Sequence, residues 1–432
     1  MSSPTDTHVL LRAFVDELTH CGLRAACTSP GSRSTPLVLA LAREQRIRCY
    51  SHIDERCAGF FALGLAKAGG LPVAVTCTSG TAVAELLPAA IEAREARVPL
   101  LLLTADRPPE LRESGAGQTI DQLKLFGGAA KWFFEVGNHE ATPERLRWMR
   151  TLACRAWWRT LEGRPGVVHL NFPLREPLVW DGPLPQEREG RPDGQPLLTR
   201  TPARLHAPAD MDELAKPVAR SRRGVMVAGR HERNTPLGEA AAAFCAATGW
   251  PLLADPLSGA RRGEAAVAHY DALLRDAAFA AQMTPDLVLR VGDLPTSKPL
   301  RAWLAGMREV PQAVLDIEDS WQDPDAALCR CFALEPAAAL WRLSDSPSAA
   351  DPDWLATWRS ADERAAEAIL GVLADGGAEP GVLHLGTSGL SEPSVAAELG
   401  VLLPSEATLF VASSMPVRDI ESFWPVRPDP PR

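Results

Sequence analysis

The stretch at residues 23–34, LRAACTSPGSRS, decides the fold of the first part of the chain. Its first six residues predict a short buried strand, and the run of Ser, Pro, Gly and Arg that follows predicts a loop leading into a helix. Further strands are expected at 47–52, 72–77, 98–104 and 166–171, with helices at 6–20 and from 55 onward. Strands that alternate with helices in this way form a parallel sheet covered on both faces. The prediction is therefore an α/β fold of doubly wound parallel-sheet domains.

Changes in composition divide the chain into three parts. Residues 175–205 and 344–353 are rich in Pro and polar residues, which is typical of linkers. We expect an N-terminal α/β domain at 1–180, a middle α/β domain at 200–343 and the start of a third domain at 350–432. Beyond 200, strands are expected at 224–228, 251–254, 287–291 and 313–316, and helices at 235–247 and 353–373. The third domain is expected to be truncated, because residues 409–412 have the pattern of a buried strand and nothing after them could cover it.

Composition excludes several classes of protein. The chain has 432 residues, 46% hydrophobic and 23% charged, so it is not intrinsically disordered. Its longest apolar stretch, residues 98–103, is far shorter than the roughly 18 residues that a membrane-spanning helix needs. The net charge of −9 gives no reason to expect nucleic acid as a partner, and the nine Cys and nine His show no zinc-site spacing. Since no signal peptide is recognisable, we expect the protein in the cytoplasm.

The loops at the carboxyl ends of the predicted strands carry most of the candidate functional residues, because ligands of open α/β sheets bind there. The loop at 29–34 combines hydroxyl groups, a flexible backbone and Arg33, so it could hold an anion; alternatively, Ser34 only caps the next helix. Glu55 lies in HIDER at 52–56, where a helix begins. It is a candidate acid, but acidic residues at a helix start are also favoured by the helix dipole alone.

Three further positions leave a similar choice open. Residues 78–81, Thr-Ser-Gly-Thr, could cradle a polar ligand or merely cap their helix. Arg107 follows an apolar strand, where it could bind a carboxylate or pair with the neighbouring Asp106. Lys298 is one of only five lysines in the chain, and it could have a specific role or be an exposed residue at a helix start.

Nine blocks of sequence, in order and over nearly the whole chain, resemble one family. They are SPGSRSTPL at 29–37, HIDER at 52–56, FFALGLAK at 60–67, TSGTAVA at 78–84, LTADRPPELR at 103–112, Gln118 with residues 121–122, PTSK at 295–298, WQDP at 321–324 and SMPVRD at 414–419. The family is that of the 2-succinyl-5-enolpyruvyl-6-hydroxy-3-cyclohexene-1-carboxylate synthases, the MenD enzymes of menaquinone biosynthesis. The resemblance implies the domain fold of thiamine-diphosphate enzymes and the family's transferase activity.

The resemblance also implies roles for individual residues. In this family a glutamate beside the pyrimidine ring activates thiamine diphosphate, and Glu55 matches this catalytic glutamate. The cofactor then decarboxylates 2-oxoglutarate, and the succinyl-semialdehyde carbanion adds to isochorismate. By resemblance, the cofactor is bound by Glu55, Pro30, Gly31, Thr78 and Gly80, and the anionic substrates by Ser32, Arg33, Arg107, Gln118, Lys298, Ser414 and Arg418. A homodimer or homotetramer is expected, since the active site of this enzyme class forms between two subunits.

The sequence departs from the family pattern in two small ways and one large way. Gly117 and Ser413 stand where Asn is expected. The family binds Mg²⁺, which bridges the cofactor's diphosphate, through Gly-Asp and a downstream Asn in a C-terminal domain. The three Asn of this chain are at 138, 171 and 234, so Gly292-Asp293 has no downstream Asn partner. We therefore expect no metal ligand in this chain, place the Mg²⁺ ligands in a missing C-terminal domain, and expect the chain alone to be inactive.

Two other functions stay open on the sequence. The chain could be a non-catalytic, truncated remnant that binds anionic ligands or a partner chain. It could also be a different thiamine-diphosphate decarboxylase or a relative of acetolactate synthase. The density of Arg residues at strand ends argues against small neutral substrates, so this alternative is the weakest of the three hypotheses.

Overall fold

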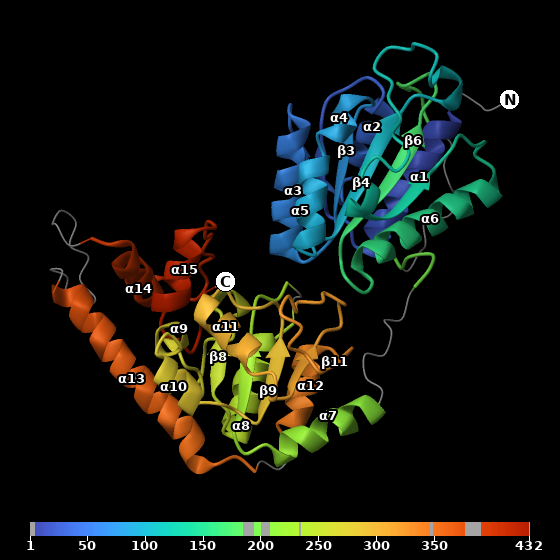
Figure 1. Cartoon of the computed structure of the whole chain (residues 1–432). Coiled ribbons are helices and arrows are strands. Elements are labelled where there is room, and N and C mark those ends of the chain that lie inside the picture. Colours follow the sequence, from blue (N-terminus) through green and yellow to red (C-terminus); the bar gives the residue numbers. More distant parts are fainter. Residues whose placement is uncertain are drawn as a thin grey trace. The chain divides into compact units, whose positions relative to one another are not determined.

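The computed structural model describes residues 5–184, 194–199, 208–232, 235–345, 349–375 and 390–431. The chain forms two compact units, Met1–Pro202 and Ala203–Arg432, each with its own sheet (Figure 1). Every strand pair in both sheets is parallel, which confirms the predicted α/β fold. Among these residues, every helix is too short or too polar to cross a bilayer.

The first unit contains a six-stranded sheet in the order β2-β1-β3-β4-β6-β5. Its strands are β1 (Ala25–Thr28), β2 (Arg48–Ser51), β3 (Val73–Cys77), β4 (Leu100–Asp106), β5 (Ala130–Glu135) and β6 (Val167–Pro173). One core cluster joins the sheet to α1 (Asp6–Cys21), α2 (Thr35–Arg43) and α6 (Pro143–Leu161). A second joins it to α3 (Glu55–Gly69), α4 (Thr81–Ala84) and α5 (Leu87–Glu95). The helices therefore cover both faces of the sheet.

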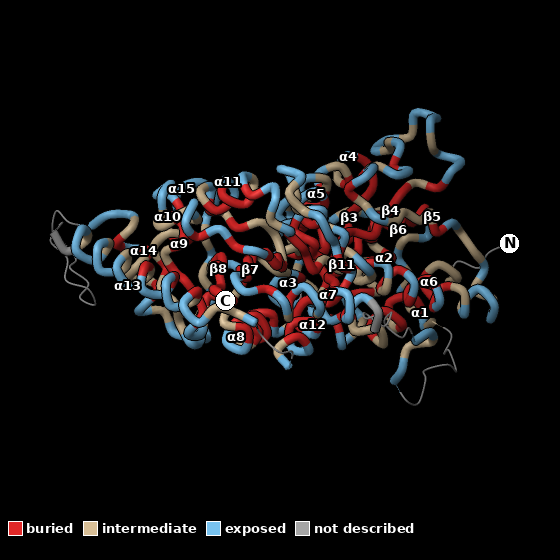
Figure 2. Tube along the Cα trace, turned by 60° about the horizontal axis from the view of Figure 1, so that its bottom comes forward, coloured by how far each residue is buried: buried red, intermediate tan, exposed pale blue. Residues whose placement is uncertain are grey.

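The inner strands of this sheet are hydrophobic on both faces because both faces are covered. Every residue of β3, β4 and β6 is buried, whereas the edge strands β2 and β5 are mostly half-buried or exposed. Continuous apolar runs of this kind are typical of parallel sheets. In Figure 2 the buried segments, in red, lie along these strands and on the inner sides of the helices.

The second unit contains a five-stranded sheet in the order β11-β10-β9-β7-β8. Its strands are β7 (Gly224–Ala228), β8 (Leu252–Ala254), β9 (Leu287–Val291), β10 (Gln312–Leu315) and β11 (Arg330–Phe332). Its helices are α7 (Pro208–Arg220), α8 (Leu237–Thr248), α9 (Tyr270–Leu273), α10 (Ala277–Gln282), α11 (Lys298–Gly306), α12 (Pro336–Leu343), α13 (Pro352–Asp375), α14 (Glu392–Leu402) and α15 (Met415–Phe423). The strands and helices predicted for this part are confirmed to within two residues, with one exception.

The exception is the strand predicted at 409–412, which is wrong. These residues have no regular structure, and the side chain of Phe410 is 95% exposed. Leu409 and Val411 pack instead against a small cluster that contains Ala396 of α14, Ile420 of α15 and Trp424, which directly follows α15. Leu409 and Val411 point inward and Phe410 points outward, so the side chains alternate as they would in a strand. The inward side chains pack on helices, and no strand of the described residues pairs with this segment.

The domain boundary expected near residue 350 does not separate two compact units, since the second unit extends from 203 to 432. Helix α13 contributes to the core of the second sheet. The indole of Trp354 donates a hydrogen bond to the backbone carbonyl of Gly224 at 2.9 Å, and Trp358 is fully buried in the same cluster. Further along the helix, the Asp362 carboxylate accepts hydrogen bonds from the backbone N–H groups of residues 268 and 269.

Candidate active site

Four loops of the first unit lie at the same edge of its sheet. They follow β1, β2, β3 and β4, which are parallel and adjacent in the order β2-β1-β3-β4. The chain moves from β1 to β2 in one direction and then to β3 on the other side of β1. Ligands of open α/β sheets bind at the carboxyl ends of strands where the strand order reverses in this way.

The loop after β1 lies directly against the end of β3. A Cβ atom at Gly31 would lie only 2.3 Å from the Cβ of Thr78. Any residue other than glycine would therefore clash with Thr78 at this position. The hydroxyl of Ser34 donates a hydrogen bond to the carbonyl oxygen of Gly31 at 3.0 Å and makes no cap bond to α2. The alternative role of Ser34 as a helix cap is therefore not seen. Pro30 and Ser32 are exposed on this loop.

Glu55 is the first residue of α3, and its neighbour Asp54 takes the capping role. The Asp54 carboxylate accepts a hydrogen bond from the backbone N–H of Arg56 at 2.9 Å. Glu55 is half-buried, and its carboxylate makes no hydrogen bond or ion pair within the described residues. Burial, and then the negative charge of Glu55, raise the pKa of the Cys77 thiol at the end of β3. The charge of Glu55 therefore acts at the end of β3, and its carboxylate oxygens accept no hydrogen bond within the described residues.

Arg107, after β4, faces the loop that follows β3 and not its own neighbour Asp106. Its guanidinium donates to the Ser79 hydroxyl, and only its backbone N–H donates to the Asp106 carboxylate, at 2.7 Å. Asp106 pairs instead with Arg112 at 2.8 Å. Burial, and next the like charge of Arg33, lower the pKa of the Arg107 guanidinium. Arg33 and Arg107 are therefore close enough for their like charges to act on each other, and the charge of Asp106 opposes this effect at Arg107.

The closer partner of the Arg33 guanidinium is a backbone carbonyl and not a carboxylate. Its guanidinium donates to the carbonyl oxygen of Leu174 at 2.9 Å, and the exposed carboxylate of Glu176 is 3.8 Å away. The buried Nε of Arg33 has no hydrogen-bond partner within the described residues. Two guanidinium groups with so little compensation form a site that favours an anion.

Gln118 lies against the loop after β3. Its side-chain amide donates to the carbonyl oxygen of Ser79 at 3.2 Å, and the Ser79 hydroxyl donates to the carbonyl oxygen of Gln118 at 3.2 Å. Gly80 has a φ of +89°, and a Cβ there would lie 3.1 Å from Cγ of Gln118. Residues 78–80, the loop after β3, therefore contact Gly31, Arg107 and Gln118, and the charge of Glu55 acts on Cys77 just before them.

A buried polar network, absent from the sequence predictions, supports this loop from below. The side-chain carbonyl of Asn171 accepts hydrogen bonds from Gln122 and Thr104, each at 2.9 Å. Its amide nitrogen donates to the carboxylates of Asp106 and Glu135, each at 2.8 Å. Burial raises the pKa of Asp106, although the hydrogen bond from Asn171 acts in the opposite direction.

Gln122 connects this network to the loop. Its carbonyl oxygen accepts a hydrogen bond from the backbone N–H of Gly80 at 2.9 Å, and its amide donates to the carbonyl oxygen of Ala105 at 3.0 Å. The sequence contained one signal for the network. His169 and Asn171 stand two residues apart in VVHLNFP, so two polar side chains share one face of a strand that is otherwise apolar.

The remaining predicted substrate residues lie in the second unit. Lys298 is exposed and opens α11, whose N-cap Ser297 accepts a hydrogen bond from the backbone N–H of Leu300 at 3.2 Å. Ser414 and Arg418 are exposed at the start of α15. Ser414 therefore follows an irregular segment and not the buried strand that we expected before it.

Two other groups of side chains have the residue types of a metal site, and each is satisfied by its own contacts. Asp293 forms an ion pair with Arg230 at 3.1 Å. Among the described residues, Glu17, Cys21 and Cys154 form one group with metal-ligand geometry, but Cys154 donates to Glu17 at 3.2 Å and Cys21 to Cys154 at 3.7 Å. These hydrogen bonds account for the group without a metal. The absence of metal ligands from this chain stays a prediction.

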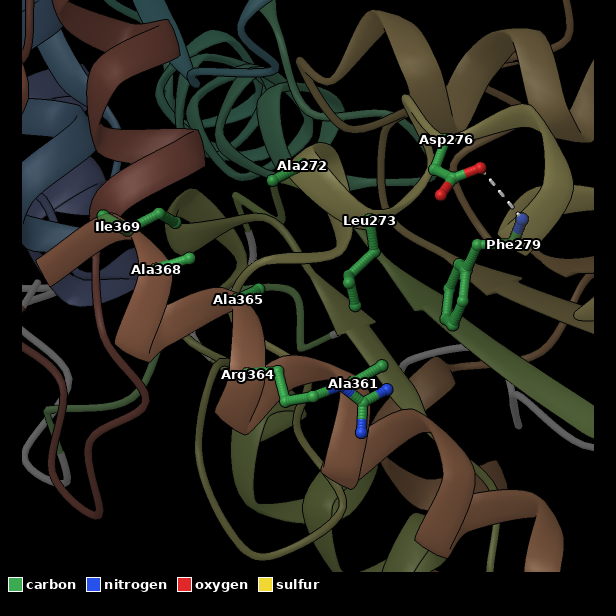
Figure 3. A pocket seen from close by; sticks show the side chains of 9 residues that line it. All are labelled: Ala272, Leu273, Asp276, Phe279, Ala361, Arg364, Ala365, Ala368 and Ile369. Atoms are coloured by element: carbon green, nitrogen blue, oxygen red, sulfur yellow. Dashed lines mark hydrogen bonds between the residues drawn. The ribbon is translucent and has the colours of Figure 1, made fainter. Parts of the chain in front are cut away.

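A pocket of about 400 Å³ in the second unit lies between α9, α10 and α13 (Figure 3). Its lining consists of Ala272, Leu273, Asp276, Phe279, Ala361, Arg364, Ala365, Ala368 and Ile369. The Asp276 carboxylate is occupied as the cap of α10, because it accepts hydrogen bonds from the backbone N–H groups of Ala278 and Phe279. The pocket contains none of the predicted site residues.

Two family models match the sequence of the chain. Residues 9–125 match the family model described as "Thiamine pyrophosphate enzyme, N-terminal TPP binding domain", and residues 193–411 match "Middle domain of thiamine pyrophosphate". The first match contains the four loops at the sheet edge.

Several similar proteins carry the name 2-succinyl-5-enolpyruvyl-6-hydroxy-3-cyclohexene-1-carboxylate synthase. That of Chloroflexus aurantiacus is 41% identical over 97% of this chain and 70% of its own length. Those of Geobacillus thermodenitrificans and Haloquadratum walsbyi are 41% and 37% identical, over 95% and 98% of this chain and 69% and 73% of their own lengths. The chain therefore belongs to the 2-succinyl-5-enolpyruvyl-6-hydroxy-3-cyclohexene-1-carboxylate synthase family of thiamine pyrophosphate enzymes.

Proposed function

We propose that the chain acts as a 2-succinyl-5-enolpyruvyl-6-hydroxy-3-cyclohexene-1-carboxylate synthase in menaquinone biosynthesis. With thiamine diphosphate it would decarboxylate 2-oxoglutarate and join the remaining four-carbon unit to isochorismate. The observation that carries the proposal is the Glu55 carboxylate, which has no partner within the described residues and lies beside the end of β3. The name shared by relatives 37–41% identical to the chain supports the choice of reaction.

The first unit has features that fit the pyrimidine half of thiamine diphosphate. At Gly31 the backbone comes so close to Thr78 that no side chain could stand between the two loops, and Gly80 has a positive φ beside Gln118. The proposed cofactor residues Pro30, Gly31, Thr78 and Gly80 thus supply mostly backbone. When bound, thiamine diphosphate supplies a carbon nucleophile and an electron sink. The task of Glu55 is to share a proton with a ring nitrogen of the cofactor, for which its carboxylate oxygens are available.

The cationic residues of both units support anionic substrates. 2-Oxoglutarate and isochorismate each carry two carboxylates, and planar guanidinium groups bind carboxylates through paired hydrogen bonds. The like charges of Arg33 and Arg107 act on each other in the first unit, and the buried Nε of Arg33 has no partner within the described residues. We propose that Ser32 and Gln118 complete this receptor, and that Lys298, Ser414 and Arg418, all exposed in the second unit, form another.

Three further parts of the proposal follow from the cofactor and the family. Mg²⁺ is proposed to accompany the cofactor, since this ion commonly bridges phosphate oxygens. A homodimer or homotetramer is proposed as the working form, and the cytoplasm as the compartment. Size-exclusion chromatography with light scattering, with and without thiamine diphosphate and Mg²⁺, tests the assembly.

The test of the function compares the wild-type chain with Glu55→Gln. Each is incubated with thiamine diphosphate, Mg²⁺, 2-oxoglutarate and isochorismate, and the loss of isochorismate is followed by absorbance. Glu55→Gln keeps the size of the side chain but removes the acid, so we expect kcat to fall by about 100-fold or more. Glu144→Gln, an exposed change on α6, is the control and should retain wild-type turnover. Measurable turnover that is equal in wild type and Glu55→Gln would refute the role of Glu55.

The same assay separates the synthase from the alternative of a binding protein without turnover. The observation that favours the alternative is the exposure of Ser414 and Arg418, at the start of a helix that follows an irregular segment. The same exposure supports the expectation that this chain alone is inactive. Turnover by the wild-type chain would refute both the alternative and that expectation. No turnover, together with calorimetric binding of 2-oxoglutarate, would support the binding protein.

A further inference from the structure

The second unit contains a buried carboxylate, Asp271 on α9, that joins two segments distant in sequence. The side chain of Asp271 is 5% exposed. One carboxylate oxygen accepts a hydrogen bond from the Ser297 hydroxyl at 2.6 Å, and the other accepts one from the Ser422 hydroxyl at 3.1 Å. Arg275, one turn further on, donates to the second oxygen at 2.9 Å and balances the charge. Both carboxylate oxygens of Asp271 therefore accept hydrogen bonds from residues of the second unit.

Each of the two serines lies next to one of the exposed cations of the proposed substrate site. Ser297 immediately precedes Lys298 and caps α11, so its hydroxyl fixes the first turn of that helix while it donates to Asp271. Ser422 lies four residues, about one helical turn, after Arg418 on α15. Helix α9 contacts both α11 and α15 (Figure 1).

A second set of buried contacts anchors α15 beside the first. Tyr270, the neighbour of Asp271, donates its hydroxyl to the Glu421 carboxylate. The Arg261 guanidinium donates to the carbonyl oxygens of Glu421 and Trp424, each at 2.9 Å. The Tyr270 contact holds α15 against α9, the Arg261 contacts hold it against the segment between β8 and α9, and neither involves α11. Asp271 differs from them because, at one side chain, it connects α15 with the segment that carries Lys298.

We propose that Asp271 is a positioning residue that fixes Lys298 and Arg418 relative to each other, so that the two cations form one receptor for a carboxylate-bearing substrate. This inference rests on the proposed function for its ligand, but the coupling between the two segments does not. Lys298 and Arg418 each gain from a fixed position, because ordering a long side chain and its backbone on binding costs conformational entropy.

The coupling is tested by hydrogen exchange, followed by mass spectrometry, in the full chain. In Asp271→Ala we expect faster exchange in both residues 295–300 and 415–424, since both hydroxyls lose their acceptor. Asp271→Asn, of nearly equal size, is the second variant in case the alanine variant fails to fold. Ser422→Ala should affect only 415–424. Asp276→Ala, which removes the cap of α10 five residues away, is the matched control and should affect neither segment. Unchanged exchange in both segments of Asp271→Asn and Asp271→Ala would overturn the proposal.

The functional consequence is tested by steady-state kinetics with each substrate varied in turn. Contacts to substrate carboxylates that are made equally in ground and transition states act on KM. We expect the KM for 2-oxoglutarate or isochorismate to rise by about tenfold in Asp271→Asn, with kcat within about twofold of wild type. Unchanged KM values for both substrates would overturn the receptor role. A wild-type chain without turnover would refute the proposed function, while the exchange experiment would still decide the coupling.

Discussion

Acid is expected to destabilise the first unit through His169, a residue of β6 that is completely buried beneath the candidate site. The Thr104 hydroxyl donates its proton to Asn171, so it can only accept from His169, whose Nε2 is 2.7 Å away. The imidazole therefore carries its proton on Nε2, and its Nδ1 has no partner within the described residues. Phe126 and Phe133 pack on the ring at centroid distances of 4.7 and 5.1 Å. A second proton on Nδ1 would be buried among apolar groups.

The size of the effect follows from the shift in proton affinity. Burial lowers the pKa of His169 to about 3, from an ordinary value of 6.5. The unfolded chain takes up a proton as the pH falls below 6.5, whereas the folded chain does so only near pH 3. The stability that this histidine contributes is therefore complete above pH 6.5 and is lost as the pH falls. Between pH 7 and pH 4 the loss is about 3 kcal/mol by proton linkage.

The assay compares urea unfolding of wild type and His169→Phe at pH 7, 6, 5 and 4. Phenylalanine keeps the ring contacts and cannot be protonated, so groups other than His169 cancel in the difference between the two chains. We expect the free energy of unfolding of the wild type to fall by about 3 kcal/mol more than that of the variant over this range. His139→Phe, at a half-buried histidine of the same unit, should follow the wild type. Parallel pH profiles for wild type and His169→Phe would refute the reasoning.

Two other predictions concern single side chains. Gly31→Ala should destabilise the first unit by about 1–3 kcal/mol and weaken thiamine diphosphate binding, because the new methyl group meets Thr78. Gly64→Ala, at a helical position with open space around it, should instead stabilise the first unit by about 0.5–1 kcal/mol. Thermal unfolding of each variant with and without thiamine diphosphate measures stability and cofactor binding. Equal effects of the two substitutions would contradict the predicted clash at Gly31. Burial, and then the charge of Asp255, hold the pKa of Glu421 well above its ordinary value of 4.5, so the stability it contributes is complete below pH 4.5 and is lost as the pH rises. Glu421→Gln should therefore become more stable relative to wild type from pH 5 to pH 8 in urea unfolding, and a constant difference between the two would argue against a raised pKa at this buried acid.

The fold could be predicted wherever burial on both faces left a mark in the sequence. The segments of β3 and β4, VAVTC and LLLLTAD, are continuous apolar runs because helices cover them on both sides. The edge strand β11 is short and mostly exposed, so it leaves no such mark. Strand β5, AKWFFE, is also a partly exposed edge strand, and it is absent from the strands predicted from the sequence. Its aromatic residues do favour a strand. The segment at 409–412 shows the converse error, since apolar residues in alternation also suit an extended segment packed on helices.

The sequence by itself determined which residues stand at the strand ends: Glu55 at a helix start, the loop of Gly31, and the arginines 33 and 107. These are local facts, because each depends on a strand and the few residues after it. Only the tertiary structure decided how their charges are used. Asp54 caps α3 and leaves Glu55 available, and Asp106 pairs with Arg112 and leaves Arg107 to face Ser79.

The same holds for the residues that support the sites. Asn171 meets Gln122 and Thr104 across 49 and 67 positions of sequence, and Asp271 meets Ser422 across 151. A hydrogen bond acts over about 3 Å, so such partners are set by the order of strands in a sheet and by the packing of helices. Local sequence patterns record burial and chain direction, and neither specifies which distant side chain will complete a buried polar group.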